Sequence, residues 1–353
     1  GFRLQDTSLS QLTPVCIPGL PQGATFMGVP GPNVPPPGTV VACPREETIS
    51  FSEFTPRFTV DWQATENAFL YASVARGYKP GGFNVNEVNE FTGQGYLPEF
   101  VTAYEIGVKT TWLDGRVILN GDIYFNDYTD QQIGVQRTQT GSGNAVLAVP
   151  GIGNAGSVET MGVEFDGYWD LDNGFELTLG YAYTDAEFKS YIQGPPPGST
   201  AAEFAACGVP DGQSSSTQLR TESGNICGDF SGNAVAKSPE HSLNFNVYYS
   251  RDFGVDKFWF VDLATQYRSR RFLDEANLSW MPDYTLFDVT AGVDLGEVTL
   301  TAFVRNLTDD DTIRSAQRNV DPGNPEGFAP GRGVVAYLPE PRTFGVRAAY
   351  QFK

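Results

Sequence analysis

The side chains best suited to ligand chemistry in this sequence are arginines, which gather in two places. Arg268, Arg270 and Arg271 stand close together at the end of one predicted strand, and Arg314, Arg318 and Arg332 lie in the long segment 308–340. A guanidinium group binds a carboxylate through two parallel hydrogen bonds. These arginines are therefore candidate contacts for an anionic ligand, such as a carboxylate-bearing iron chelate. Pairing with acidic side chains of the loops is the competing interpretation, and on the sequence alone it is the favoured one.

Aromatic residues in the predicted loops are further candidates for ligand contact. They are Phe83, Tyr96, Phe272 and Trp280. Packing of these rings within the loops explains them equally well, so both interpretations stay open.

The four cysteines fall into two local pairs, Cys16 with Cys43 and Cys207 with Cys227. Each pair brackets a stretch rich in Pro and Gly or in Ser and Gly, without periodic hydrophobicity. This pattern predicts two disulfides within loops, and disulfides indicate an oxidising compartment. A zinc site would need closer spacing and usually histidine. Free buried thiols are the alternative.

No arrangement of residues indicates an enzyme. His241 is the single histidine, and no Gly-rich phosphate loop follows a parallel strand. Asp309, Asp310 and Asp311 could offer oxygen ligands to calcium, but the spacing and the glycine of an EF-hand are absent. We therefore expect no catalytic residue, no cofactor and no resident metal. The formal net charge of −19 also argues against a nucleic-acid partner, whose phosphates need a cationic surface.

The elements that must position these side chains are strands, because apolar and polar residues alternate with a period of two. In the segment 103–112, Tyr104, Ile106 and Val108 share one face, while Glu105 and Lys109 share the other. The pattern recurs in segments 117–125, 163–171, 175–184, 242–249, 287–295 and 343–352. No apolar run of about 18 residues is present, which excludes a transmembrane helix. A membrane-spanning strand needs only about 10 residues, every second one apolar.

The alternation predicts about eleven strands, at 54–65, 68–79, 99–112, 116–129, 157–171, 174–190, 240–251, 257–272, 283–295, 297–307 and 341–352. Short turns alternate with long loops, which fall at 80–98, 130–156, 191–239, 273–282 and 308–340. Outer-membrane barrels have short periplasmic turns and long extracellular loops. The sequence therefore predicts an all-β fold, namely a transmembrane antiparallel β-barrel in contact with outer-membrane lipid.

The strand pattern also predicts how the chain is divided. Residues 1–53 are expected to be an extracellular loop after a truncated strand, and residues 54–353 to be the C-terminal portion of the barrel. The first and last predicted strands both descend to the periplasm, which gives an odd count, whereas bacterial barrels usually have an even one. We therefore expect an ascending strand upstream, with residues 1–4 as its last residues.

Alternation assigns side chains to the two faces of the predicted barrel. The residues expected to face lipid are Val163, Phe165, Leu177, Leu179, Phe245 and Val289. Aromatic residues near strand ends are expected to form interfacial girdles, and these are Trp112, Tyr128, Trp169, Tyr183, Trp259 and Tyr267. Polar residues of the interior include Asp122, Glu164 and Asp166.

Six segments, in order along the chain, resemble the C-terminal barrel of TonB-dependent receptors. The most specific is YEIGVKTTWLDGRVILNGDIYFNDYTDQQI (104–133), with its Glu-x-Gly-x-Lys strand and Asp-Gly turn. The others are NAFLYASVARGYKPGGFN (67–84), NAGSVETMGVEFDGYWDL (154–171), SPEHSLNFNVYY (238–249), FVRNLTDDDT (303–312) and PRTFGVRAAYQF (341–352). The resemblance covers roughly residues 54–353.

The resemblance implies a barrel of about 22 strands around an N-terminal plug. It also implies uptake of a scarce solute, such as a siderophore-bound iron, cobalamin or a carbohydrate, driven by the inner-membrane TonB complex through the plug. The plug, the coupling segment and about half of the barrel are expected to be missing from this chain. A passive porin or structural barrel is the alternative function, and a soluble β-rich adhesin is a third.

Overall fold

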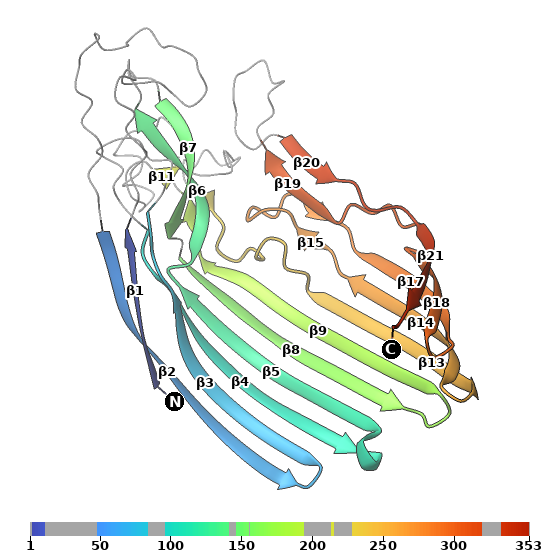
Figure 1. The fold of residues 1–353 in the computed structure, drawn as a ribbon. Helices are drawn as coiled ribbons and strands as arrows, with labels where there is room; N and C mark the ends of the chain where they lie inside the picture. Colours follow the sequence, from blue (N-terminus) through green and yellow to red (C-terminus); the bar gives the residue numbers. More distant parts are fainter. Residues whose placement is uncertain are drawn as a thin grey trace.

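The computed structural model describes residues 2–10, 48–83, 96–140, 146–154, 156–193, 213–214, 228–319 and 333–352. Twelve strands within these ranges form one antiparallel sheet and lie side by side in their sequence order (Figure 1). They are β1 (Phe2–Ser10), β2 (Thr48–Thr65), β3 (Ala68–Lys79), β4 (Glu99–Trp112), β5 (Val117–Thr129), β8 (Ser157–Asp170), β9 (Phe175–Ser190), β13 (His241–Gly254), β14 (Lys257–Arg268), β17 (Tyr284–Asp294), β18 (Val298–Arg305) and β21 (Thr343–Tyr350). The described residues include no helix that is long and apolar enough to cross a membrane.

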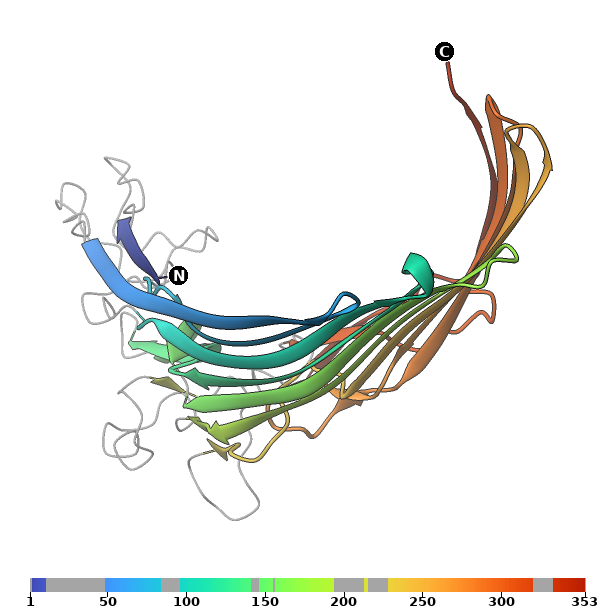
Figure 2. The same cartoon turned by 90° about the horizontal axis from the view of Figure 1, so that it is seen from below.

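The sheet bends into an open trough. In Figure 2 the strands follow an arc whose two edges, β1 and β21, lie well apart. Neighbouring strands exchange backbone hydrogen bonds, in continuous register where Ala68–Lys79 of β3 pairs with residues 99–110 of β4 and with single register shifts in three other pairs. The predicted antiparallel barrel architecture is confirmed, although the sheet is not closed on itself within the described residues.

The eleven predicted strands are present as β2 to β5, β8, β9, β13, β14, β17, β18 and β21. The expected loop over residues 1–53 needs correction, because Phe2–Ser10 forms β1 and β2 already begins at Thr48. β1 lies antiparallel to β2, so it takes the ascending position that was expected upstream of the chain. The sequence of β1 is mostly polar, and its strand conformation follows from pairing with β2 rather than from alternation. Residues 11–47 lie outside the described part.

Cross-strand register sorts the side chains onto two faces. Ile106, Ile123 and Val163 lie opposite one another on β4, β5 and β8, and they are 58%, 54% and 43% exposed. Through the pairings of β9, β13, β14 and β17, the same face continues to Leu177 and Val289. All six residues predicted to face lipid lie on this apolar face, which we call the outer face. The opposite, polar face lines the trough and is called the inner face.

Aromatic side chains collect at the ends of the outer face. Near the short turns, the ring centroids of Phe175 and Tyr249 are 4.4 Å apart, and those of Tyr249 and Trp259 are 5.1 Å apart. Five of the six predicted girdle residues lie on the outer face; the exception is Tyr128. Tyr128 and Phe125 are three residues apart in β5, so their side chains point to opposite faces. Tyr128 therefore points to the inner face and packs against a buried cluster there.

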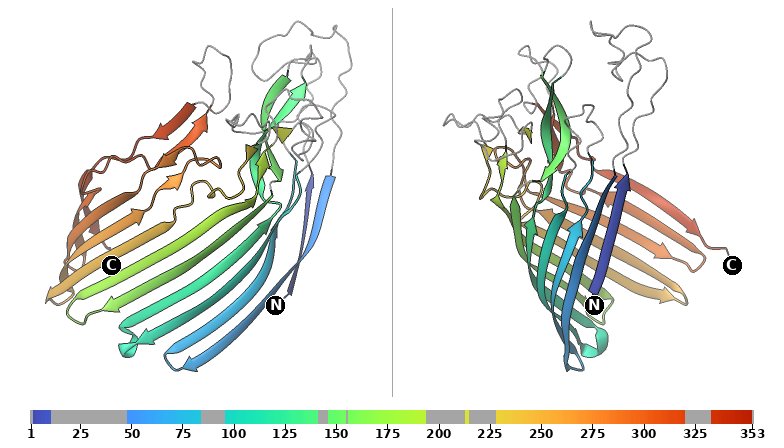
Figure 3. Two further views of the ribbon diagram at one scale, coloured as in Figure 1. Left: turned by 180° about the vertical axis from the view of Figure 1, so that it is seen from behind. Right: turned by 90° about the vertical axis from the view of Figure 1, so that its left-hand side faces the viewer.

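The two ends of the strands differ in construction (Figure 3). One end carries short connections, including η1 (Leu113–Gly115). The other end carries small sheets, formed by β6 (Gln132–Thr140), β7 (Val146–Asn154) and β11 (Gln213–Ser214), by β10 (Ile192–Gln193) and β12 (Gly228–Asp229), by β15 (Arg271–Phe272) and β16 (Trp280–Met281), and by β19 (Ser315–Asn319) and β20 (Gly333–Tyr337). The predicted alternation of short turns and long loops is therefore confirmed.

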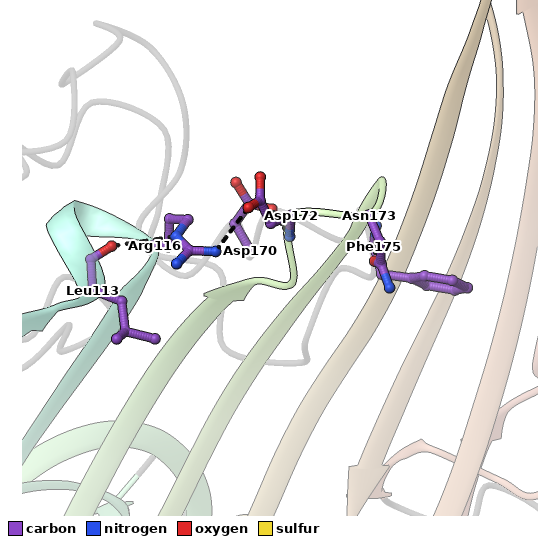
Figure 4. Close-up of polar contacts among 6 residues, drawn as sticks. All are labelled: Leu113, Arg116, Asp170, Asp172, Asn173 and Phe175. Atoms are coloured by element: carbon purple, nitrogen blue, oxygen red, sulfur yellow. Dashed lines mark hydrogen bonds and ion pairs between the residues drawn. The ribbon is translucent and has the colours of Figure 1, made fainter.

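At the turn end, neighbouring hairpins are tied together. Arg116, which follows η1, forms an ion pair of 3.2 Å with Asp172 in the turn between β8 and β9 (Figure 4). The turn of Asp172 is closed locally, because the backbone N–H of Phe175 donates to the side chain of Asn173 at 3.2 Å. Asp172 and Gly174 have φ values of 61° and 90°, which suits Asp and Gly at a tight turn.

Candidate functional site: the inner face and its loop end

Carboxylates from adjacent strands line the middle of the inner face. Glu105 of β4, Asp122 of β5 and Glu164 of β8 border a hollow of about 370 Å³. Two residues along both strands, on the same face, the side-chain amide of Asn120 donates to Asp166 at 2.7 Å. The expected interior acids therefore do lie on the inner face. Their arrangement offers hydrogen-bond acceptors and negative charge to whatever fills the trough.

The predicted Glu-x-Gly-x-Lys strand is organised around one tyrosine on the neighbouring strand β3. The hydroxyl of Tyr71 donates to Glu105 at 2.6 Å, and Lys109 lies 5.8 Å from the centre of its ring. Between them, the ring crosses Gly107 so closely that a Cβ there would lie 2.5 Å from ring atoms. Each element of the motif thus contacts Tyr71, which explains the combination of acid, glycine and lysine at alternate positions.

At the loop end, amide side chains tie the β3–β4 and β5–β8 connections together. Asn154 accepts from the backbone N–H of Leu97 at 2.7 Å and donates to the carbonyls of Leu97 and Asp130 at 2.9 and 2.8 Å. Gln132 donates from its side chain to the carbonyl of Pro80 at 2.9 Å. These bonds satisfy backbone groups where the chain leaves the sheet. Asn154 is the first residue of the Asn-Ala-Gly segment that the sequence singled out.

A buried aromatic cluster holds the next loop against the inner face. It contains Val158, Phe188, Tyr191 and Phe230, all at most 6% exposed. Tyr128 packs against this cluster rather than standing at a lipid interface.

The β9–β13 and β14–β17 loops are joined beside that cluster. The side chain of Asn277 accepts from the backbone N–H of Ala234 at 2.8 Å and donates to its carbonyl at 2.9 Å. In the first of these loops, the Ser231 hydroxyl and backbone N–H hydrogen-bond to Asp229 and hold the pKa of that carboxyl below its usual value. The loop end is therefore built from cross-loop contacts.

The candidate arginines differ in their surroundings. Arg268 donates to the carbonyls of Tyr267 at 2.9 Å and Leu243 at 3.3 Å. Arg270 is exposed and lies 5.7 Å from the ring centre of Phe272. Trp280, in the short β16, is 57% exposed.

Arg271 and Arg314 come together from different loops. Both guanidinium groups lie over the ring of Tyr284, at 5.5 and 5.7 Å from its centre. Nη2 of Arg271 donates to the backbone carbonyl of Arg314. Arg268 pairs with Tyr284 in the backbone register of β14 and β17, but its guanidinium turns the other way, toward Leu243 and Asn244 of β13, so only Arg271 and Arg314 share the ring. Tyr284 was not among the residues expected to contact ligand, although its even-numbered position already placed it on the face opposite Phe287, Val289 and Val293.

The Asn-Leu-x-Asp segment at the start of the last loop stabilises that loop through hydrogen bonds. Asn306 is 5% exposed and donates from its side chain to the carbonyls of Asp310 at 2.9 Å and Glu340 at 3.1 Å. Asp309 accepts from the backbone N–H of Arg342 at 2.8 Å. The acidic run thus joins the two ends of the loop, and in the described part of the chain no group of three metal-ligating side chains could hold an ion.

Several candidates lie outside the described residues. They are Arg332 and all four cysteines, Cys16, Cys43, Cys207 and Cys227; for Arg318 only the backbone, in β19, is described. The two disulfides stay a prediction, which peptide mass mapping under non-reducing conditions would test.

The family model described as TonB dependent receptor-like, beta-barrel, matches residues 31–307. A probable TonB-dependent siderophore receptor, PiuA of Acinetobacter baumannii, is 21% identical over 256 residues, which cover 71% of this chain and 29% of that relative. The metal-pseudopaline receptor CntO of Pseudomonas aeruginosa is 38% identical over 63 residues, or 18% of this chain and 8% of that relative.

Solved structures give the same picture of the fold. The ferric yersiniabactin uptake receptor FyuA from Yersinia pestis superposes with a TM-score of 0.63 at 18% identity, covering 87% of this chain and 39% of that chain. The structure of PiuA from Acinetobacter baumannii gives a TM-score of 0.59 at 19% identity, over 88% of this chain and 37% of that chain. The chain thus spans well under half the length of these proteins.

Proposed function

Because the chain belongs to the TonB-dependent receptor-like β-barrel family, whose members are receptors and transporters rather than enzymes, we propose that it takes part in energised uptake of a scarce solute. The match confirms the resemblance that the sequence motifs indicated. Its apolar outer face is the surface that a barrel presents to the lipid of the bacterial outer membrane.

The observation that carries the proposal is the contrast between the inner face and the loop end. The inner face is polar and hollowed beside Glu105, Asp122 and Glu164. The loop end gathers arginines and aromatic rings from several loops on that same side. A receptor barrel needs both features: a polar wall around its passage and a recognition surface at its outer entrance.

The partners follow from this role. We propose a small solute ligand at the loop end, a plug domain against the inner face, and the inner-membrane TonB complex acting through that plug. Siderophore-bound iron is the first candidate solute, because PiuA is described as a probable siderophore receptor and FyuA as a ferric yersiniabactin uptake receptor. Closure of the sheet needs further strands at β1 and β21, since open edges in lipid would leave backbone groups unsatisfied.

Uptake by the full-length protein tests the proposal. The protein is expressed in the outer membrane of a host that lacks its own receptors for the probes. The probes are iron-55 complexes of citrate, of a catecholate and of a hydroxamate, and labelled cobalamin. We expect saturable accumulation of at least one probe, abolished when a protonophore collapses the proton gradient. Uptake that neither saturates nor responds to the gradient would establish a passive porin instead.

A further inference from the structure

Arg271 places a positive charge at a buried position. Its side chain is 9% exposed, and Nη1 is buried without a hydrogen-bond partner among the described residues. Guanidinium groups keep their proton in proteins. A buried charge is costly unless an opposite charge is within reach. Among the described residues, no ion pair balances the charge of Arg271.

Nearby carboxylates are engaged with other donors. Asp288 accepts from the backbone N–H of Asn306 at 2.9 Å. Both carboxylate oxygens of Asp310 accept from Thr312, each at 3.1 Å. None of the ion pairs among the described residues involves Arg268 or Arg314 either. The pairing with loop acids that the sequence favoured is therefore not observed among the described residues for Arg268, Arg271 and Arg314.

The surroundings of Arg271 suit a planar anion. Arg314 lies over the same ring of Tyr284, so two guanidinium groups share one aromatic platform. Arg268 lies at the paired position on β14, on the inner face. Arg314 donates from Nε and Nη2 to the carbonyls of Thr312 and Asp310 at 3.5 and 3.4 Å, and Arg271 donates from Nη2 to the carbonyl of Arg314. Nη1 of each arginine is the group that can hold a carboxylate by a charge-assisted hydrogen bond.

We infer that Arg271 and Arg314, held over Tyr284, bind a carboxylate group of the solute. The inference rests on the proposed function and narrows its ligand to solutes that bear carboxylates, such as a polycarboxylate metal chelate. Arg268, whose guanidinium hydrogen-bonds to β13, and the exposed Arg270 and Trp280 lie outside this site.

Ligand-dependent melting of the purified full-length protein tests the inference. The Tm is measured with citrate or malonate, and with inorganic phosphate, each against chloride at equal ionic strength. A carboxylate that binds only the folded protein raises the Tm as its concentration increases. We expect Arg271→Met to weaken citrate or malonate binding by about tenfold or more.

The matched control is Arg270→Met, which removes the same charge one residue away and should keep the full shift. If Arg271→Met does not fold, Arg314→Met replaces it, because the backbone carbonyl that accepts from Arg271 remains. Equal shifts in the wild type and both site variants would overturn the inference. So would a shift with phosphate alone, or no shift with any anion.

Failure of this inference can be told apart from failure of the proposed function, because melting requires no transport. An Arg271-dependent citrate shift with gradient-independent uptake would refute only the proposed function. Gradient-dependent uptake without such a shift would refute only the carboxylate site.

Discussion

On strands β3, β4, β5 and β8, the outer and inner faces are stabilised by different means. Outward side chains such as Ile106 and Val163 are apolar and exposed, so their environment is the lipid. Inward side chains are joined across strands, as Tyr71 is to Glu105 and Asn120 to Asp166. The outer face thus depends on the absence of charge, whereas the inner face depends on particular partners.

The largest effect expected from this comparison is that of a charge in the middle of the outer face. Val163→Arg should destabilise the folded protein by about 2–4 kcal/mol, because the guanidinium would face lipid. The matched inner-face change, Asn244→Arg, should cost less, since water and polar groups can solvate the charge. Denaturant unfolding in lipid vesicles measures both free energies. Equal costs would mean that the faces are assigned wrongly.

A smaller effect is expected where an inner-face ring needs space. In Gly107→Ala, the new Cβ would lie 2.5 Å from the ring of Tyr71 and would displace it from Glu105. We expect a loss of about 1–3 kcal/mol in the free energy of unfolding. Gly180→Ala is the control on the same face, where a Cβ meets nothing within 4 Å. Similar losses for both variants would show that the ring does not require the glycine.

The smallest effect concerns one hydroxyl. Tyr71→Phe removes the hydrogen bond to Glu105 and should cost about 0.5–1.5 kcal/mol. Tyr104→Phe removes a hydroxyl from the outer face, where Tyr104 is 47% exposed, and should leave stability nearly unchanged. A larger loss for Tyr104→Phe, in the same unfolding measurement, would contradict the assignment of roles to the two faces.

The strands and their faces could be predicted because alternation is local. Tyr128 shows that position near a strand end is a weaker guide than alternation. Its place near the end of β5 suggested an interfacial girdle, but it is three residues from the outward Phe125, and an odd separation in a strand puts the two side chains on opposite faces. Only the first residues of β1 could be predicted as a strand; its extent to Ser10 could not, because its residues alternate weakly and its conformation depends on pairing with β2.

Contacts between distant residues set the limit of sequence reasoning at the loop end. The arginines could be identified as candidate ligand contacts from their residue type, but which of them lie close together depends on which loops meet. Arg271 touches Arg314 and Tyr284 through tertiary contacts that no spacing along the chain reveals. The role of Gly107 was equally hidden, because it depends on the register between β3 and β4.

The order of the strands has a consequence for how such a sheet is assembled. Each strand pairs with those that precede and follow it in the main sheet, so no pairing must wait for a remote part of the chain. The entropy lost in closing a loop rises slowly with its length, by about 0.6 kcal/mol for each doubling. The sheet can therefore grow hairpin by hairpin from any nucleus, and a gained or lost hairpin would change the circumference of the barrel while leaving every other pairing intact.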